Sequence, residues 1–313
     1  MRVFLTIFLL GMFSLIAEAK NVVKNFPFEQ VTANGWVMHG PLGHPTAENQ
    51  GFINNPGMII TEAGVVLVDP GSSVQVGEMV LRMVKQVTSA PIVATFNTHV
   101  HGDHWFGNQA IRAAYPDAPI YGHPNLIKEA EEGKAGQWLA MMDRLTEGFT
   151  RGTVAELPNR ALNHGDEIKI GNHTFRMHHY GQSHTHTDLM VEVVEEKMVF
   201  LGDNAMSGRF GGMQDGTFLG NANALQQVLK SGAETWVPGH GPTGGSEVVT
   251  TFADYLNTVY GAALYAFDEG IESDEVKPIV VEQTIHYRNW VGYELEIGRH
   301  VGYAYLEVEA NEF

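Results

Sequence analysis

The stretch that decides the fold runs from Thr98 to Asn108 and reads Thr98-His99-Val100-His101-Gly102-Asp103-His104-Trp105-Phe106-Gly107-Asn108. Within it, three histidines and an aspartate lie in six consecutive positions: His99, His101, Asp103 and His104. Imidazole nitrogens and carboxylate oxygens suit a borderline divalent ion such as zinc, so this density predicts a metal site. The alternative is a polar surface loop whose histidines coincide by chance, but a cluster carries much more information than a lone histidine.

The residues before the cluster predict where it lies in the fold. The apolar run Pro91 to Phe96 is typical of a buried strand in a parallel sheet. The histidines would then follow the carboxyl end of that strand, where sites in open α/β sheets gather. Alternate residues of a loop project differently, so His99 and His101 can face one ion while Asp103 and His104 face another. We therefore expect two neighbouring metal ions.

Three later segments offer the remaining ligands, and each lies directly beside a predicted strand. They read Gly181-Gln182-Ser183-His184-Thr185-His186-Thr187-Asp188, then Phe200-Leu201-Gly202-Asp203-Asn204, and then Trp236-Val237-Pro238-Gly239-His240-Gly241. Glycines beside the last histidine let the backbone pass close to an ion.

These motifs, in this order, resemble those of the metallo-β-lactamase superfamily, over roughly residues 34–245. The resemblance implies a four-layered αββα sandwich of the α/β class with two metals at the edge between the sheets. Carried over by residue, it places His99, His101 and His184 on the first ion, Asp103, His104 and His240 on the second, and Asp203 between them. It also implies two Zn²⁺ ions, with Fe or Mn as alternatives, and gives Asp103 a catalytic role in orienting a hydroxide.

Two assignments within this resemblance stay open. His184 fits the family spacing better, because Thr185 follows it and Asp188 leads into an apolar strand, which leaves His186 beside the metals or facing the substrate. Asp69, at the end of a predicted strand, either supports the ligand loops or serves as a turn or helix cap. Four further histidines, at positions 164, 173, 178 and 179, match no motif and are interpreted as ordinary surface or strand residues.

The rest of the chain predicts alternating strands and helices. Strands are expected at 34–39, 58–61, 65–68, 120–121, 168–170, 174–177, 189–194, 198–201 and 235–237. Helices are expected from residue 76 to 87, at 111–114, from 124 to 145 with breaks near Gly133 and Gly136, at 222–229 and at 248–267. The segment from Tyr293 to Glu309 is mixed and could be helical. We expect a signal peptide at residues 1–19, a hydrolase domain at 20–245 and a C-terminal helical extension packed on the core at 246–313.

Net charge, the amino-terminal segment and the absence of cysteine limit which partners and which cell compartment are expected. The 313-residue chain has a formal net charge of -17, which disfavours nucleic acid and anionic membranes. An apolar amino-terminal segment ending in Ala17-Glu18-Ala19 is typical of a cleaved secretory signal, so a periplasmic or secreted protein without a membrane contact is expected. The absence of cysteine excludes disulfides and thiolate ligands. A small molecule is the expected substrate, and the sequence carries no signal for the oligomeric state.

The resemblance implies an exported binuclear zinc hydrolase, in which a hydroxide held by both ions attacks an ester, amide, thioester or lactam carbonyl. The chain resembles the periplasmic branch of β-lactamase-like, quinoprotein-relay-associated hydrolases, so a β-lactamase is one option. It departs from the lactamases that use a cysteine, because Asp203 stands at that element. The alternatives are a di-iron oxidoreductase of the same fold, whose members carry Glu where this chain has His101, and a non-catalytic binding module.

The choice between His184 and His186 can be tested by metal counting. If His184 is the ligand, His184→Ala lowers the number of metal ions bound per chain, whereas His186→Ala leaves it unchanged. Elemental analysis of the dialysed proteins measures both numbers. A loss confined to His186→Ala would reverse the assignment.

Overall fold

The computed structural model describes residues 22–312, so the signal peptide expected at 1–19 lies outside the described residues. Two sheets carry the fold. The strands of the first are β1 (Glu29–Gln30), β2 (Gly35–Val37), β3 (Gly57–Thr61), β4 (Gly64–Val68), β5 (Ile92–Phe96), β6 (Ile120–Gly122) and β7 (Arg160–Ala161). Those of the second are β8 (Glu167–Ile170), β9 (His173–His178), β10 (Met190–Val193), β11 (Met198–Phe200) and β12 (Thr235–Val237).

The first sheet follows the chain order from β1 to β7, antiparallel as far as β4 and parallel from β4 onward. The second has the order β12-β11-β10-β9-β8, and only β11 and β12 are parallel. Parallel pairing brings strand ends that are distant in sequence to the same edge. The ends of β5 and of β11 and β12 therefore supply the loops of the site.

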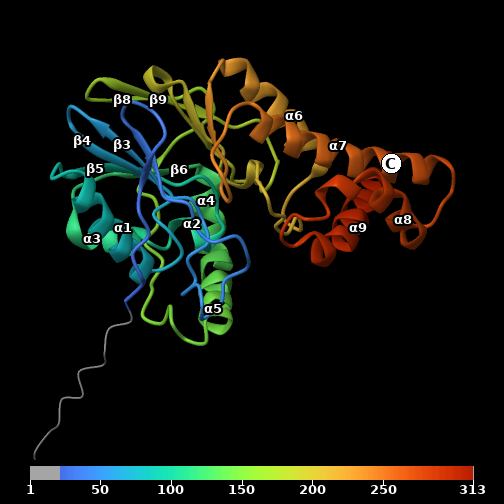
Figure 1. Cartoon of the computed structure of the whole chain (residues 1–313), viewed down its shortest axis with the longest axis horizontal. Helices are drawn as coiled ribbons and strands as arrows, with labels where there is room; N and C mark the ends of the chain where they lie inside the picture. Colours follow the sequence, from blue (N-terminus) through green and yellow to red (C-terminus); the bar gives the residue numbers. More distant parts are fainter. Residues whose placement is uncertain (1–21, 313) are drawn as a thin grey trace, which may run out of the picture.

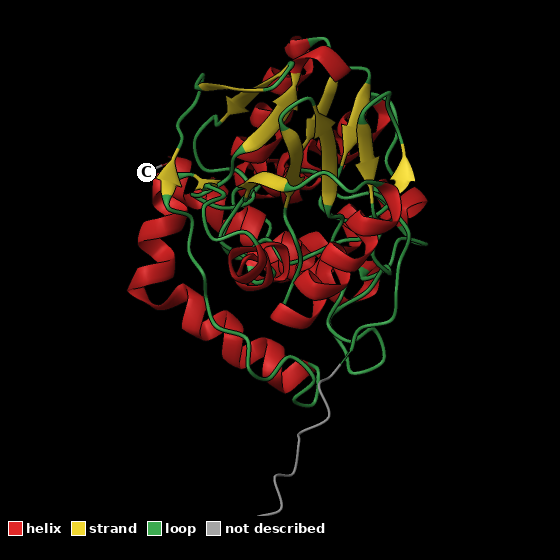
Figure 2. Ribbon diagram, turned by 90° about the vertical axis from the view of Figure 1, so that its left-hand side faces the viewer, coloured by secondary structure: helices red, strands yellow, loops and turns green. Residues whose placement is uncertain are grey.

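Helices cover the outer faces of both sheets. Their bounds are α1 (Val74–Val87), α2 (Gly102–Trp105), α3 (Asn108–Ala114), α4 (Pro124–Glu129), α5 (Ala135–Leu145), α6 (Phe218–Val228), α7 (Glu247–Asp268), α8 (Ser273–Gln283) and α9 (Tyr293–Glu312). Figure 1 shows α1 and α3 on one side of the strands and α6 to α9 on the other. The strands lie side by side with helices around them in Figure 2, which agrees with the predicted αββα sandwich. None of the helices in residues 22–312 is long and apolar enough to cross a membrane.

Strand β4 shows why the layers form. All five of its residues are buried, and successive side chains of a strand point to opposite faces. Val66 and Val68 enter the core between the sheets, whereas Val65 and Leu67 pack in the cluster under α1. A strand that is apolar on both faces needs a layer on each side, so it cannot lie at the surface.

Most expected elements are present, with small differences. Helix α1 begins after Ser73, whose side chain caps the helix by accepting a hydrogen bond from the backbone N–H of Val76. The helical stretch 124–145 is interrupted at Gly133, which has a φ of 120° inside a π-helical turn (Ala130–Lys134), but not at Gly136, which lies within α5.

The C-terminal segment is helical, as the sequence predicts, but its helices differ in detail from the expected ones. The mixed stretch that starts at Tyr293 forms the continuous helix α9. Helix α8 was not expected, because Pro278 lies inside it and proline is unfavourable in a helix interior. Residues of α7, α8 and α9 share one apolar cluster with α6 and the outer face of the second sheet. Tertiary packing therefore outweighs weak helix propensity here.

The core between the sheets predicts a large stability cost for one substitution. Phe175 of β9 is fully buried and stacks on Phe96 of β5 with ring centroids 5.2 Å apart. Phe175→Ala should reduce the free energy of unfolding by about 3–5 kcal/mol, because it leaves a cavity between the sheets. Urea unfolding of the metal-free protein measures this. Val154→Ala, at a 55% exposed position, is the control and should change stability by no more than about 0.5 kcal/mol. Equal stability of the two variants would contradict the assignment of this core.

Candidate metal centre

The ligand loop follows β5, as expected. His99 and His101 lie between the end of β5 and the start of α2, and Asp103 and His104 lie within α2. Two hydrogen bonds to the backbone of Val100 fix the loop, since its N–H donates to Thr187 Oγ1 at 2.9 Å and its carbonyl accepts from Trp105 Nε1 at 3.0 Å. The histidines are therefore held on a rigid turn.

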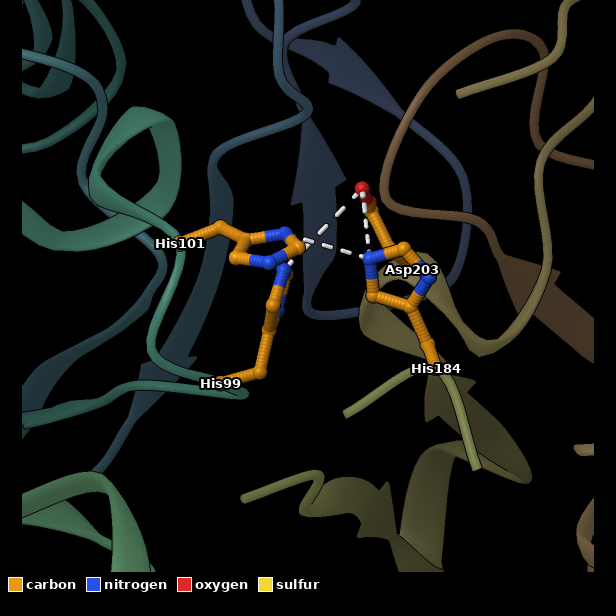
Figure 3. A group of neighbouring side chains, drawn as sticks. All are labelled: His99, His101, His184 and Asp203. Atoms are coloured by element: carbon orange, nitrogen blue, oxygen red, sulfur yellow. Dashed lines mark hydrogen bonds and ion pairs between the residues drawn. The ribbon is translucent and has the colours of Figure 1, made fainter. Parts of the chain in front are cut away.

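A first group of four side chains converges at this edge. His99, His101, His184 and Asp203 each offer a ligand atom, and these atoms all lie within 4.8 Å of one another. Figure 3 shows them pointing into one space, with His99 and His101 on one side and His184 and Asp203 on the other. His101 Nδ1 lies 3.2 Å from His184 Nε2, and Asp203 Oδ2 lies 3.7 Å from His184 Nε2.

A second group lies against the first. Asp103, His104 and His240 also offer ligand atoms within 4.8 Å of one another, and His240 Nε2 lies 3.3 Å from Asp103 Oδ2. Asp203 faces this group too, with Oδ1 3.1 Å from His104 Nε2 and Oδ2 3.3 Å from His240 Nε2. All of the residues predicted as ligands are thus brought together, and Asp203 lies where a carboxylate shared by two ions is expected.

Several buried atoms of the site have no hydrogen-bond partner. They include His99 Nε2 and Asp103 Oδ1. An unsatisfied buried polar atom is costly, so native proteins contain few of them. Nitrogen and oxygen atoms that converge in this way suit divalent metal ions such as zinc, which would satisfy them. The donor set therefore fits the pair of ions that the sequence predicts.

The electrostatics favour the protonation states that metal ligands need. Burial lowers the pKa of His99 well below its usual range and that of His184 to about 3, so both imidazoles are neutral. Burial raises the pKa of Asp203, but His240 and His104 outweigh this and hold it well below its usual range. The pKa of Asp103 falls to about 2 because His104 and His240 outweigh burial in the same way. Neutral imidazoles and ionised carboxylates are the forms that bind metals.

His104 is the exception among the imidazoles. Burial lowers its pKa, but the carboxylates of Asp203, Asp103 and Asp69 raise it well above the usual range. Without a metal, this ring carries a proton among three anions. A divalent cation would take over the role of that proton, so metal binding here should release a proton.

Asp69 supports the ligand loop, which is the first of the two roles considered for it. Its Oδ1 accepts from the Thr98 N–H at 2.9 Å, and its Oδ2 lies 2.6 Å from Thr98 Oγ1 and 2.9 Å from His104 Nδ1. His240 Nδ1 is likewise held by the Ile53 carbonyl at 2.8 Å. In each ring the other nitrogen, Nε2, faces the ligand group, which is the usual arrangement around a metal-binding histidine.

The remaining histidines lie outside both groups. His186 is exposed, whereas His184 is buried in the first group. His173 pairs with Glu196 at 3.0 Å and His178 with Glu192 at 2.7 Å, so these two are buried strand histidines with carboxylate partners. Neither His164 nor His179 belongs to a ligand group.

Sequence reasoning missed the pocket beside the metal groups. It has a volume of about 230 Å³, and Trp138, Met141 and Leu145 of α5 contribute to its lining. Arg209 lines it from the loop after Asp203, and Glu296 and Arg299 line it from α9. No local motif marks these residues, because they meet only through tertiary packing.

Asp215 is a further residue beside the ligand groups that no ligand motif of the sequence marks. Its Oδ2 lies 3.0 Å from His101 Nε2, and its Oδ1 accepts from Lys134 Nζ at 2.7 Å. The hydrogen bond from His101, together with that from Lys134, lowers the pKa of Asp215 although burial opposes the shift. Asp215 is therefore an anion in direct contact with an imidazole of the first group.

The chain resembles metal-dependent hydrolases in sequence. A family model described as the metallo-beta-lactamase superfamily matches residues 50–240. A hydroxyacylglutathione hydrolase of Bdellovibrio bacteriovorus is 27% identical over 189 residues, which are 59% of this chain and 62% of that protein. A hydroxyacylglutathione hydrolase of a Synechococcus species is 35% identical over 102 residues, 30% of this chain and 38% of that protein. The chain thus matches less than two thirds of the length of either relative.

Solved structures share the fold. A metallo-beta-lactamase from Pontibacter korlensis has a TM-score of 0.60 at 18% identity, covering 74% of this chain and 99% of that chain. A double mutant of the sec-alkyl sulfatase PisA1 has a TM-score of 0.71 at 15% identity, covering 90% of this chain and 50% of that chain. At such identities the likeness concerns the fold alone.

A buried histidine between α9 and the pocket should make the stability of the fold depend on pH. His300 of α9 is buried, its Nδ1 lies 2.7 Å from the Tyr255 hydroxyl, and its Nε2 donates to the carbonyl of Gly211, a pocket residue, at 2.9 Å. Burial lowers the pKa of His300 to about 4. The unfolded chain therefore takes up this proton at a higher pH than the folded one, and stability falls as pH falls from about 6.5 to about 4.

The pKa of His300 differs between about 6.5 in the unfolded chain and about 4 in the folded chain. This difference lowers the free energy of unfolding at acidic pH by on the order of 3 kcal/mol. Replacing His300 by Gln should flatten the pH profile of the unfolding free energy of the metal-free protein by that amount. His286→Gln, at an exposed position in the same region, should keep the parent slope. Parallel profiles for parent and His300→Gln would contradict the prediction.

Proposed function

Because the chain belongs to the metallo-beta-lactamase superfamily, we propose that it is an exported zinc hydrolase with two metal ions that cleaves a small-molecule ester, amide, thioester or lactam. The observation that carries this proposal is the presence of two buried ligand groups that share one carboxylate, that of Asp203. Curated relatives are hydroxyacylglutathione hydrolases, and one structural neighbour is a metallo-beta-lactamase, which supports hydrolysis of a carbonyl compound.

In this proposal, each ligand group holds one ion. His99, His101 and His184 would hold one, Asp103, His104 and His240 the other, and Asp203 would contact both. When bound, two zinc ions supply Lewis acidity and lower the pKa of a water molecule enough to make it a nucleophile at neutral pH.

The residues around the ligand groups would orient the attacking water molecule and bind the substrate. Asp103 is buried and ionised, so its carboxylate can accept a hydrogen bond from the attacking water as well as serve as a ligand. Trp138, Met141 and Leu145 provide an apolar wall for the acyl part of a substrate. Arg209 is buried, lines the same pocket and adds positive charge to a chain with a net charge of -17.

Export rests on the apolar amino-terminal segment ending in Ala17-Glu18-Ala19, and we propose a periplasmic or secreted location for the mature protein. The absence of cysteine is compatible with either compartment, because the fold is held by its core rather than by disulfides. Detection of a mature chain that starts after Ala19 in the exported fraction of the source cell would support this location.

A substrate panel tests the proposed activity. Nitrocefin, a lactone, a thioester and a phosphodiester should be assayed with the zinc-loaded protein, together with its metal content and oxygen consumption. We expect turnover of a carbonyl substrate with zinc bound. Iron with oxygen consumption would instead support the redox alternative, and a metal-free inert protein would support a binding module.

Two substitutions connect the activity to the metal groups. His101→Ala and His240→Ala each remove one ligand from a different group, so each should lower kcat/KM by at least about 100-fold while the circular dichroism spectrum stays that of the parent. The exposed His186→Ala is the matched control and should retain parent activity. Full activity of either ligand variant with unchanged metal content would contradict the proposed site.

A further inference from the structure

The two ring nitrogens of His101 have different surroundings. Nδ1 lies 3.2 Å from His184 Nε2, inside the first ligand group, whereas Nε2 points out of the group and lies 3.0 Å from Asp215 Oδ2. Two nitrogens bound to one tetrahedral zinc at its usual bond length are roughly 3.3 Å apart. The spacing of Nδ1 and His184 Nε2 therefore fits two ligands of one ion better than a hydrogen bond.

A neutral imidazole has one hydrogen, which resides on either nitrogen. If Nδ1 is to bind a metal, its lone pair must be free, so the hydrogen must reside on Nε2. Asp215 Oδ2 lies 3.0 Å from Nε2, and a carboxylate oxygen at this distance accepts a hydrogen bond, which favours the tautomer with the hydrogen on Nε2. The ring is also held from its face by Trp138, whose centroid lies 4.8 Å away.

Asp215 is itself fixed from two further directions. Lys134 Nζ donates to its other carboxylate oxygen at 2.7 Å, and Gln182 Nε2 donates to its backbone carbonyl at 3.1 Å. The Lys134 and Asp215 side chains are only 24% and 26% exposed, so solvent screens this ion pair less than one at the surface. Lys134 ends the π-helical turn that precedes α5, next to Gly133 with its φ of 120°.

Neither Lys134 nor Asp215 belongs to a ligand group, and the segments that carry them contribute no ligand. We propose that Asp215, held in place by Lys134, is a positioning residue that keeps His101 in the tautomer and orientation needed to bind the first metal ion through Nδ1. This inference rests on the proposed function, since it assumes that His101 is a metal ligand.

The test measures metal binding rather than activity alone. Asp215→Ala should weaken the affinity for one zinc ion roughly 10–100-fold in competition with a chromophoric chelator, the usual effect of removing a partner of a metal-binding histidine. It should also change the visible absorption of the cobalt-substituted protein. Lys134→Met should also weaken the zinc affinity, but by less than Asp215→Ala. Lys134→Arg should keep the parent affinity, because it keeps the positive charge beside Asp215.

Two controls separate positioning from a general structural role. Lys197 and Glu234 form an ion pair at 2.5 Å whose side chains are 61% and 69% exposed, and Lys197→Met and Glu234→Gln should leave zinc affinity and the cobalt spectrum unchanged. Thermal unfolding of the metal-free Asp215→Ala protein should remain cooperative. In a double-mutant cycle, adding Asp215→Ala to His101→Ala should weaken binding no further, since Asp215 acts through that ring.

The failures of the two proposals can be distinguished. If the parent binds no metal, the proposed function and this inference are both wrong. If the parent binds two ions and Asp215→Ala keeps the parent affinity and cobalt spectrum, only the positioning role is wrong. An equal loss in the exposed-pair controls, or a further loss on adding Asp215→Ala to His101→Ala, would overturn that role as well.

Discussion

The carboxylate of Asp203 is the group on which the whole site depends, because it lies between two sets of imidazoles. Its oxygens are 3.1 Å from His104 Nε2 and 3.3 Å from His240 Nε2, and 3.7 Å from His184 Nε2 on the other side. Burying so many ionisable groups together is costly unless cations neutralise them. Packing energy from the rest of the fold therefore holds together a cluster of His and Asp side chains that could bind metal ions.

Sheet topology brings these side chains together. The ligand loop follows β5 in the first sheet, whereas Asp203 and His240 follow β11 and β12, a parallel pair in the second. Their loops meet closely, since the Gly239 N–H donates to the Gly202 carbonyl at 2.7 Å. A Cβ at position 239 would collide with Asp203 Oδ1, so glycine there lets the two loops approach. The ligands are thus fixed by strand ends rather than by flexible segments.

Features that depend on residues close together in the sequence could be predicted, whereas features that depend on contacts between distant segments could not. The β5 strand and the ligand loop were predictable because their signals are local, namely an apolar run followed by closely spaced histidines. The order of the later motifs identified the sandwich through resemblance. The proline-containing helix α8 and the contact between Lys134 and Asp215 were not predictable, because they depend on packing between segments far apart in the chain. The predicted domain boundary near residue 245 stays a prediction.

The most direct test of the central claim is a crystal structure of the zinc-loaded protein with anomalous diffraction data collected at the zinc absorption edge. The account predicts two anomalous peaks per chain, about 3.5–4 Å apart, on either side of the Asp203 carboxylate. One peak should lie within bonding distance of His99 and the other of His104, at about 2.0–2.1 Å from their Nε2 atoms. A single peak, or peaks away from these residues, would contradict it.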